Sequence, residues 1–198
     1  MILNFKTIFK SAFSVAVLSA TLLTTSCDKE KDNTALEFNQ ARATATFSVI
    51  GEWWDPSDAA NWPNIYVNIS GAGAQSLSSS ATHQIILGSH VNGNISAGSA
   101  FTIRYIDKAY TAVVASDWSS ATPVGTLGRN TTSQVGWYTY NTTTRANEPV
   151  AGRTVLVGNS TGAVYAVKLN GFANVGQQGT PGVDLEVKAD INIEFKAL

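Results

Sequence analysis

The sequence predicts an all-β fold, built as a two-sheet antiparallel sandwich or an open barrel. Short runs rich in valine, isoleucine, threonine and aromatic residues recur along the chain, with glycine, asparagine and serine between them, and helical periodicity is nearly absent. The clearest run is 183–195, in which every odd position is apolar and every even position is polar. This alternation turns one face of a strand toward a core and the other toward water.

Each earlier strand is expected where a β-rich run meets a turn residue. In order along the chain these runs are 44–50, 65–70, 84–87, 101–106, 111–115, 135–140, 154–157 and 163–169. The final run is long for one strand at ~3.3 Å per residue, so we expect a bend near Ala189. Residues 158–162 match the hydrolase pattern G-x-S-x-G, but a strand-like run follows where that chemistry needs a helix. We interpret these residues as a hairpin turn.

The N-terminus has the layout of a cleavable secretory signal over residues 1–26. Lys6 and Lys10 precede an apolar run at 12–23, and small residues separate that run from Cys27. The run is shorter than the ~20 residues of a membrane-spanning helix. A cysteine at the cleavage point resembles a bacterial lipobox, in which the thiol is acylated and becomes the first residue of the mature chain. The alternative is an ordinary signal in which the cysteine stands by chance.

Residues 27–43 are expected to form the lipidated cysteine and a flexible tether, because they contain a charged run and no pattern able to bury a face. An acidic run directly after the cysteine resembles the export tag that sends lipoproteins of the Bacteroidota to the outer cell surface. On physical grounds alone the run is a spacer. Residues 44–198 are expected to form one all-β binding domain.

Composition excludes several functions. The chain has 13 basic and 14 acidic residues, and removal of the signal with Lys6 and Lys10 leaves 11 against 14, a net charge of −3, without a basic patch for nucleic acid. Cys27 is the single cysteine, so no thiol remains for a metal site once it is acylated. We expect no dedicated metal site and no enzyme, because no histidine stands near a nucleophile and the carboxylates at 52, 55 and 58 are typical of turn caps.

Four stretches, in this order, resemble the HmuY-like haem-binding lipoproteins of the Bacteroidota. They are 58–69 around Trp62, 83–87 with the loop 91–94, the glycine-tryptophan strand 136–140, and the arginine-led hairpin 152–169. The likeness covers residues 44 to the C-terminus. It implies an all-β, two-sheet protein that is anchored to the outer membrane, faces the cell exterior and carries haem to a TonB-dependent receptor.

This chain departs from that family at two positions. The family's tryptophan-aspartate pair is His83-Gln84 here, and the place of one axial histidine, five residues after Trp137, is Thr142. Haem iron takes histidine, methionine, thiolate or tyrosinate as axial ligands. The haem-contact candidates are therefore His90, His83, Tyr138 and Tyr140. The two histidines would serve one iron only if the chain reversed between them, and otherwise His90 would act alone. The alternative for each residue is structural, with His83 a packed, hydrogen-bonded strand residue and His90 a solvated loop residue.

The leading hypothesis is thus a surface lipoprotein that binds haem or a related porphyrin. The alternative is a glycan- or protein-binding surface lipoprotein on the same scaffold without haem ligation. Its basis is the stock of aromatic residues, above all Trp53-Trp54, whose rings would stack on sugars if exposed. Tryptophans more often fill the core of a sandwich, so the exposure of this pair separates the two interpretations.

Overall fold

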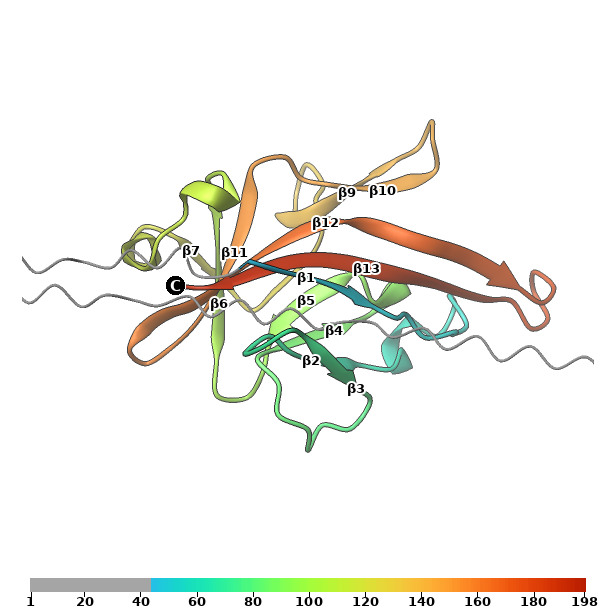
Figure 1. Ribbon diagram of the computed structural model, residues 1–198. Coiled ribbons are helices and arrows are strands. Elements are labelled where there is room, and N and C mark those ends of the chain that lie inside the picture. Colours follow the sequence, from blue (N-terminus) through green and yellow to red (C-terminus); the bar gives the residue numbers. More distant parts are fainter. Residues whose placement is uncertain (1–43) are drawn as a thin grey trace, which may run out of the picture. The chain divides into compact units, whose positions relative to one another are not determined.

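A computed structural model describes residues 44–198, which form an all-β unit of two sheets (Figure 1). The six-stranded sheet has the order β1-β13-β12-β11-β6-β7, and the seven-stranded sheet the order β10-β9-β8-β5-β4-β2-β3. One sheet curls into a half-barrel. The expected all-β, two-sheet fold is confirmed.

The strands of the first sheet are β1 (Ala45–Val49), β6 (Thr102–Asp107), β7 (Thr122–Val124), β11 (Arg153–Asn159), β12 (Gly162–Gln178) and β13 (Glu186–Ala197). Those of the second are β2 (Ile65–Asn68), β3 (Ala74–Ser76), β4 (Ile85–Gly88), β5 (Asn94–Ala97), β8 (Thr126–Arg129), β9 (Gly136–Asn141) and β10 (Ala146–Pro149). Four short 3₁₀ turns join them, namely η1 (Ala59–Asn61), η2 (His90–Asn92), η3 (Tyr110–Ala112) and η4 (Ala115–Ser119).

The core lies between the two sheets. Alternate apolar side chains of each sheet point inward and are almost completely buried, among them Val155, Val157, Val167, Ile191, Ile193 and Phe195 from one sheet and Ile65, Val67, Ile85, Leu87, Ile95, Leu127 and Trp137 from the other. Burying one such aliphatic side chain contributes roughly 1.5–3 kcal/mol. The period-two alternation in the sequence therefore identifies the side chains that face this interface.

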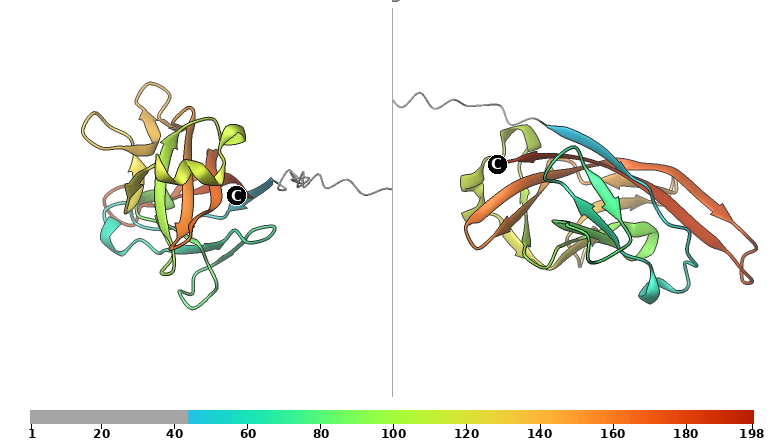
Figure 2. Two further views of the ribbon diagram at one scale, coloured as in Figure 1. Left: turned by 90° about the vertical axis from the view of Figure 1, so that its left-hand side faces the viewer. Right: turned by 60° about the horizontal axis from the view of Figure 1, so that its bottom comes forward.

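Strands β12 and β13 form a long, curved hairpin whose end projects past the other strands (Figures 1 and 2). In β13 the predicted alternation holds from residue 191 to 195, but Asp190 is also buried. β12 is bulged between Leu169 and Gly171 and again between Ala173 and Gly176. A bulged strand bends, and the second bulge lies opposite Ala189, where the sequence predicts the bend.

Two expectations from sequence are wrong in part. The run 111–115 is not a strand but η3 and the start of η4. In addition, the second sheet is not wholly antiparallel, because β8 and β9 pair in parallel. The turn at 158–162 is confirmed, since Asn159 pairs with Gly162 in a hairpin between β11 and β12.

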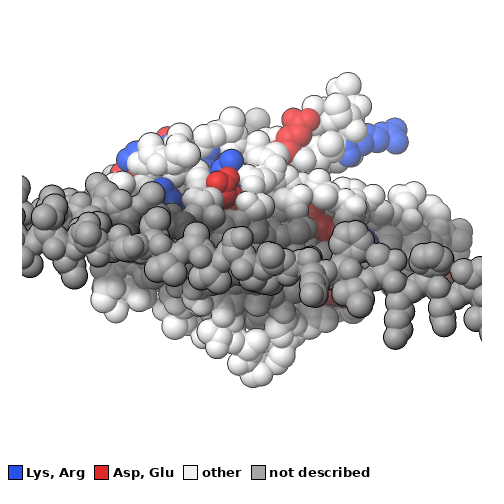
Figure 3. All heavy atoms as spheres, viewed as in Figure 1, with Lys and Arg blue, Asp and Glu red and all other residues white. Residues whose placement is uncertain are grey.

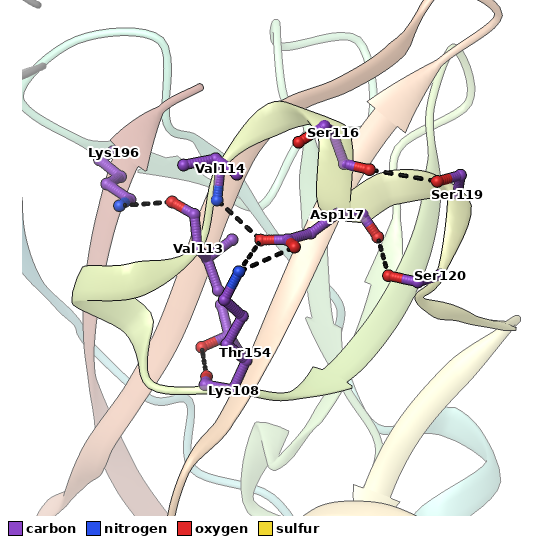
Figure 4. Close-up of polar contacts among 9 residues, drawn as sticks. All are labelled: Lys108, Val113, Val114, Ser116, Asp117, Ser119, Ser120, Thr154 and Lys196. Atoms are coloured by element: carbon purple, nitrogen blue, oxygen red, sulfur yellow. Dashed lines mark hydrogen bonds and ion pairs between the residues drawn. The ribbon is translucent and has the colours of Figure 1, made fainter.

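Side-chain bonds explain why the run 111–115 leaves the sheet (Figure 4). The carboxylate of Asp117 accepts the Val114 N–H at 2.9 Å and two bonds from Lys108 Nζ at 2.8 Å each. Lys196 Nζ donates to the Val113 carbonyl at 2.9 Å. These bonds satisfy backbone groups that a strand would have paired in a ladder, so the valines need no neighbouring strand.

Candidate functional site

A pocket of about 570 Å³ opens between the β9–β10 hairpin and the projecting part of β12. Its lining comes from six elements and one turn: His90 and Val91 from η2, Arg129 from β8, Tyr138 and Tyr140 from β9, Arg145 from the β9–β10 turn, Asn147 from β10, Val175, Gly176 and Gln177 from β12, and Val187 from β13. The pocket therefore contains three of the four predicted haem-contact residues. Its volume lies in the range of ~300–1,000 Å³ typical of small-molecule sites.

His90 stands on a short loop with an unusual backbone. Ser89, Val91 and Asn92 all have positive φ, and for the β-branched Val91 (φ 50°) this conformation is a real outlier. Such strain persists only where the surroundings hold it in place. His90 is exposed, and its ring lies tilted against Trp62, with ring centroids 5.5 Å apart.

The packing of His90 has an electrostatic consequence. Loss of water around the ring lowers the pKa of His90 below its usual value, because desolvation disfavours the charged imidazolium. Near neutral pH the imidazole is therefore uncharged and has a free lone pair. A neutral, accessible imidazole is the form that binds metals.

Two buried tryptophans hold the η2 loop from beneath. Trp62 Nε1 donates to Asn92 Oδ1 at 2.8 Å, and Asn92 Nδ2 donates to the Pro63 carbonyl at 2.7 Å. From β9, Trp137 Nε1 donates to the Gly93 carbonyl at 2.7 Å. Asn92 is completely buried. These bonds attach the loop that carries His90 to the strand that carries both tyrosines.

Tyr138 forms part of the pocket's floor. Its ring is 7 % exposed and packs edge-on against Phe172, with centroids 5.3 Å apart. Gly93 makes room for it, since a Cβ there would lie 3.2 Å from the ring and 3.3 Å from the hydroxyl. Burial raises the pKa of Tyr138, although the Arg129 guanidinium acts in the opposite direction. The side chain thus remains a phenol near neutral pH.

The side chain of Arg153, on β11, holds the start of β9 in position. Its guanidinium bonds both carboxylate oxygens of Asp107, at 2.7 and 3.0 Å, and also reaches Asn130 Oδ1 and the Gly136 carbonyl. This bond to Arg153 lowers the pKa of Asp107. One side chain thereby joins the six-stranded sheet to the strand that carries Tyr138.

The polar end of the pocket is positively charged. The Arg129 guanidinium lies over the Tyr140 ring, 5.2 Å from its centroid. Arg145 stands in the β9–β10 turn with φ 56°, and Figure 3 shows basic atoms near the free end of this hairpin, with an acidic side chain beside them. No aspartate or glutamate lines the pocket among the described residues.

His83, the fourth predicted haem contact, does not line this pocket. Its Nδ1–H donates to the Ala81 carbonyl at 2.7 Å, and its ring packs edge-on against Tyr66 and against Gly98. The chain does not reverse between the two histidines, because β4 separates them and the reversal comes at η2, which contains His90. The condition for a shared iron is therefore not met, and His83 packs among its own neighbours. The structure thus brings His90, Tyr138 and Tyr140 together and leaves His83 apart.

The Trp53-Trp54 pair is half-buried, neither a free platform nor part of the core. Trp53 packs against Gly176 on β12, and Lys188 Nζ lies 5.2 Å from its ring centroid. Trp54 forms an isolated bridge to Val187, and its Nε1 donates to the Asp58 carbonyl at 3.2 Å. Both tryptophans therefore contact the long hairpin at residues that also line the pocket.

Of the three carboxylates considered for catalysis, Asp55 caps a turn and Asp58 bonds a neighbouring side chain. Asp55 Oδ1 accepts the Ser57 N–H and hydroxyl, which lowers the pKa of Asp55, and Asp58 Oδ1 accepts from Asn61 Nδ2. Across residues 44–198, no group of three or more histidine, cysteine, aspartate or glutamate side chains is arranged to hold a metal ion. No helix in the same range has the length and apolarity needed to cross a bilayer. Cys27, the predicted lipidation site, lies outside the described residues.

Sequence reasoning missed the basic and apolar parts of the lining, namely Arg129, Arg145, Asn147, the segment 175–177 and Val187. No local motif marks these residues, because they meet only through the pairing of β8 with β9 and the curvature of β12. In the comparisons with known proteins, no family model, no curated protein and no solved structure matches this chain.

Proposed function

We propose that this protein is a lipoprotein of the HmuY-like type that binds haem or a related porphyrin in the pocket beneath the β9–β10 hairpin. One observation carries the proposal: His90 lines the same pocket of suitable size as Tyr138 and Tyr140, which lie on a strand far from it in sequence. The proposal further includes acylation at Cys27, display on the outer membrane and delivery of the ligand to a TonB-dependent receptor.

In this proposal His90 is the axial ligand of the iron. Its ring is accessible and its lowered pKa keeps it neutral near pH 7, as ligation requires. Tyr138 has a raised pKa, so it would contact the porphyrin as a phenol and not ligate as tyrosinate. The apolar side chains of Val91, Val175 and Val187 provide surfaces against which a flat ring can pack.

The test is a spectroscopic titration of the purified protein with haemin. We expect a shifted Soret band in the wild type, a changed or lost shift in His90→Ala, and an unchanged shift in the matched control His83→Ala, whose ring is bound elsewhere. An iron-free porphyrin in parallel separates ring packing from ligation, and it should bind both variants alike. No Soret change in the wild type, or equal loss in the two variants, would contradict the proposal.

The alternative, binding of a glycan or a protein, would use the same rings for stacking. Tyr140 is 39 % exposed and lies next to Arg129, an arrangement suited to an acidic sugar. Quenching of tryptophan fluorescence by an acidic oligosaccharide, together with no response to either porphyrin, would favour this alternative. We further propose that the protein does not catalyse a reaction.

A further inference from the structure

We propose that the pocket selects ligands by their carboxylates, through Arg129 and Arg145, so that it takes a porphyrin with free carboxylate groups and rejects the same ring when these groups are esterified. This inference rests on the proposed porphyrin-binding function. It names the chemical feature that the pocket recognises, which His90 and the apolar lining do not determine.

The lining of the pocket carries unpaired positive charge. Arg129 and Arg145 are both exposed, and neither forms an ion pair with any described residue. By contrast Arg153 and Lys168, elsewhere on the same fold, are paired with Asp107 and Glu194. Two unpaired guanidinium groups around one pocket, with no carboxylate in its lining, leave a positive field. An anionic ligand would complement this field.

Arg129 in its side chain and Arg145 in its backbone adopt particular conformations before a ligand binds. Arg129 is stacked on Tyr140, which restricts its conformations before a ligand arrives. Arg145 occupies a left-handed turn position, which is unfavourable for a residue with a side chain and costs glycine almost nothing. An arginine in such a position indicates that its side chain contributes something that glycine would not.

The spacing of Arg129 and Arg145 suits the recognition of one ligand. On β9, Tyr138 is paired with Arg129, and Asn141 is paired with Ala146, the residue after Arg145. Three residues of a strand span roughly 10 Å, a distance that two long side chains can bridge by converging on neighbouring groups of one ligand. Guanidinium groups bind carboxylates through paired, charge-assisted hydrogen bonds. The carboxylates would then lie toward the β9–β10 hairpin, and the ring toward His90.

The experiment compares protoporphyrin with its dimethyl ester, both iron-free, by fluorescence titration of the purified protein in one buffer. We expect the ester to bind the wild type about tenfold more weakly or worse, as the loss of charge-assisted bonds implies. Arg129→Gln and Arg145→Gln should each weaken binding of the free acid about five- to tenfold and leave binding of the ester unchanged. The matched control is Lys188→Gln, which removes a nearby positive charge outside the lining.

The outcomes separate the two proposals. Equal affinity of acid and ester, or arginine variants that affect both ligands alike, would overturn the carboxylate inference and leave porphyrin binding intact. Lys188→Gln with the effect of the arginine variants would overturn it as well, because general attraction would then explain the preference. Failure of both ligands to bind the wild type would refute this inference, whereas the proposed function is refuted by the absence of a Soret change in the haemin titration.

Discussion

Substitution of the buried Asn92 tests whether a polar network supports the site. In Asn92→Ala the Trp62 indole N–H and the Pro63 carbonyl both lose their partner, and each unsatisfied buried group costs about 1–3 kcal/mol. Alanine at φ 54° adds roughly 1 kcal/mol. We therefore expect a loss of about 3–7 kcal/mol in the free energy of unfolding, a large part of the ~5–15 kcal/mol of a typical domain.

Urea unfolding followed by circular dichroism measures this loss, and two companion variants identify its source. Asn92→Gly should be about 1 kcal/mol less harmful than Asn92→Ala, since glycine tolerates the left-handed backbone. Introduced into Trp62→Phe, which lacks the indole N–H, Asn92→Ala should cost about 1–2 kcal/mol less than in the wild type. A total loss below about 1 kcal/mol, or an equal loss in both backgrounds, would refute the role of the network.

Three further predictions concern pH and packing. Haemin binding should weaken as the pH falls and His90 becomes protonated, with a midpoint below about 6.5 because the pKa is lowered; a midpoint at or above that value would contradict the lowered pKa. Gly136→Ala should lower the free energy of unfolding by more than about 2 kcal/mol, because a Cβ there overlaps the Gly128 carbonyl, whereas Gly125→Ala, in open space, should be neutral. Asp117→Asn should cost at most about 1 kcal/mol near neutral pH, because it removes the ion pair with Lys108. The bonds with Lys108 lower the folded-state pKa of Asp117, so this stability is present above the unfolded value of about 3.9 and is lost as the pH falls through the folded-state pKa. Urea midpoints of variant and wild type should therefore converge in acid.

The parts of the fold that sequence predicts are those in which one pattern governs many residues. In β13 the apolar residues 191, 193 and 195 all face the core, so their alternation is a direct record of the interface. β7 and β10 escaped prediction because each is a short edge strand that contains proline. Such strands hold their place through one neighbour and carry little of the usual composition.

The residues of the site are likewise only partly predictable from sequence. Tyr138 and Tyr140 are recognisable from their strand, and His90 from its chemistry, but their meeting depends on Trp137 bonding the η2 loop to β9. No local pattern identifies Arg129 as part of the lining, because its place follows from a parallel pairing of β8 with β9 in a sheet expected to be antiparallel. The charge of a pocket depends on tertiary pairing, and sequence periodicity reports only local burial.

The central claim is that one pocket, formed by η2, β9–β10 and the projecting part of β12, binds the ligand. Its most direct test is an amide chemical-shift map of the isotopically labelled protein during titration with diamagnetic zinc protoporphyrin. We expect large amide chemical-shift changes at residues 90–91, 138–147 and 175–177, and little change around His83. Shifts centred on His83 or on the opposite end of the sheets, or no shifts at all, would contradict it.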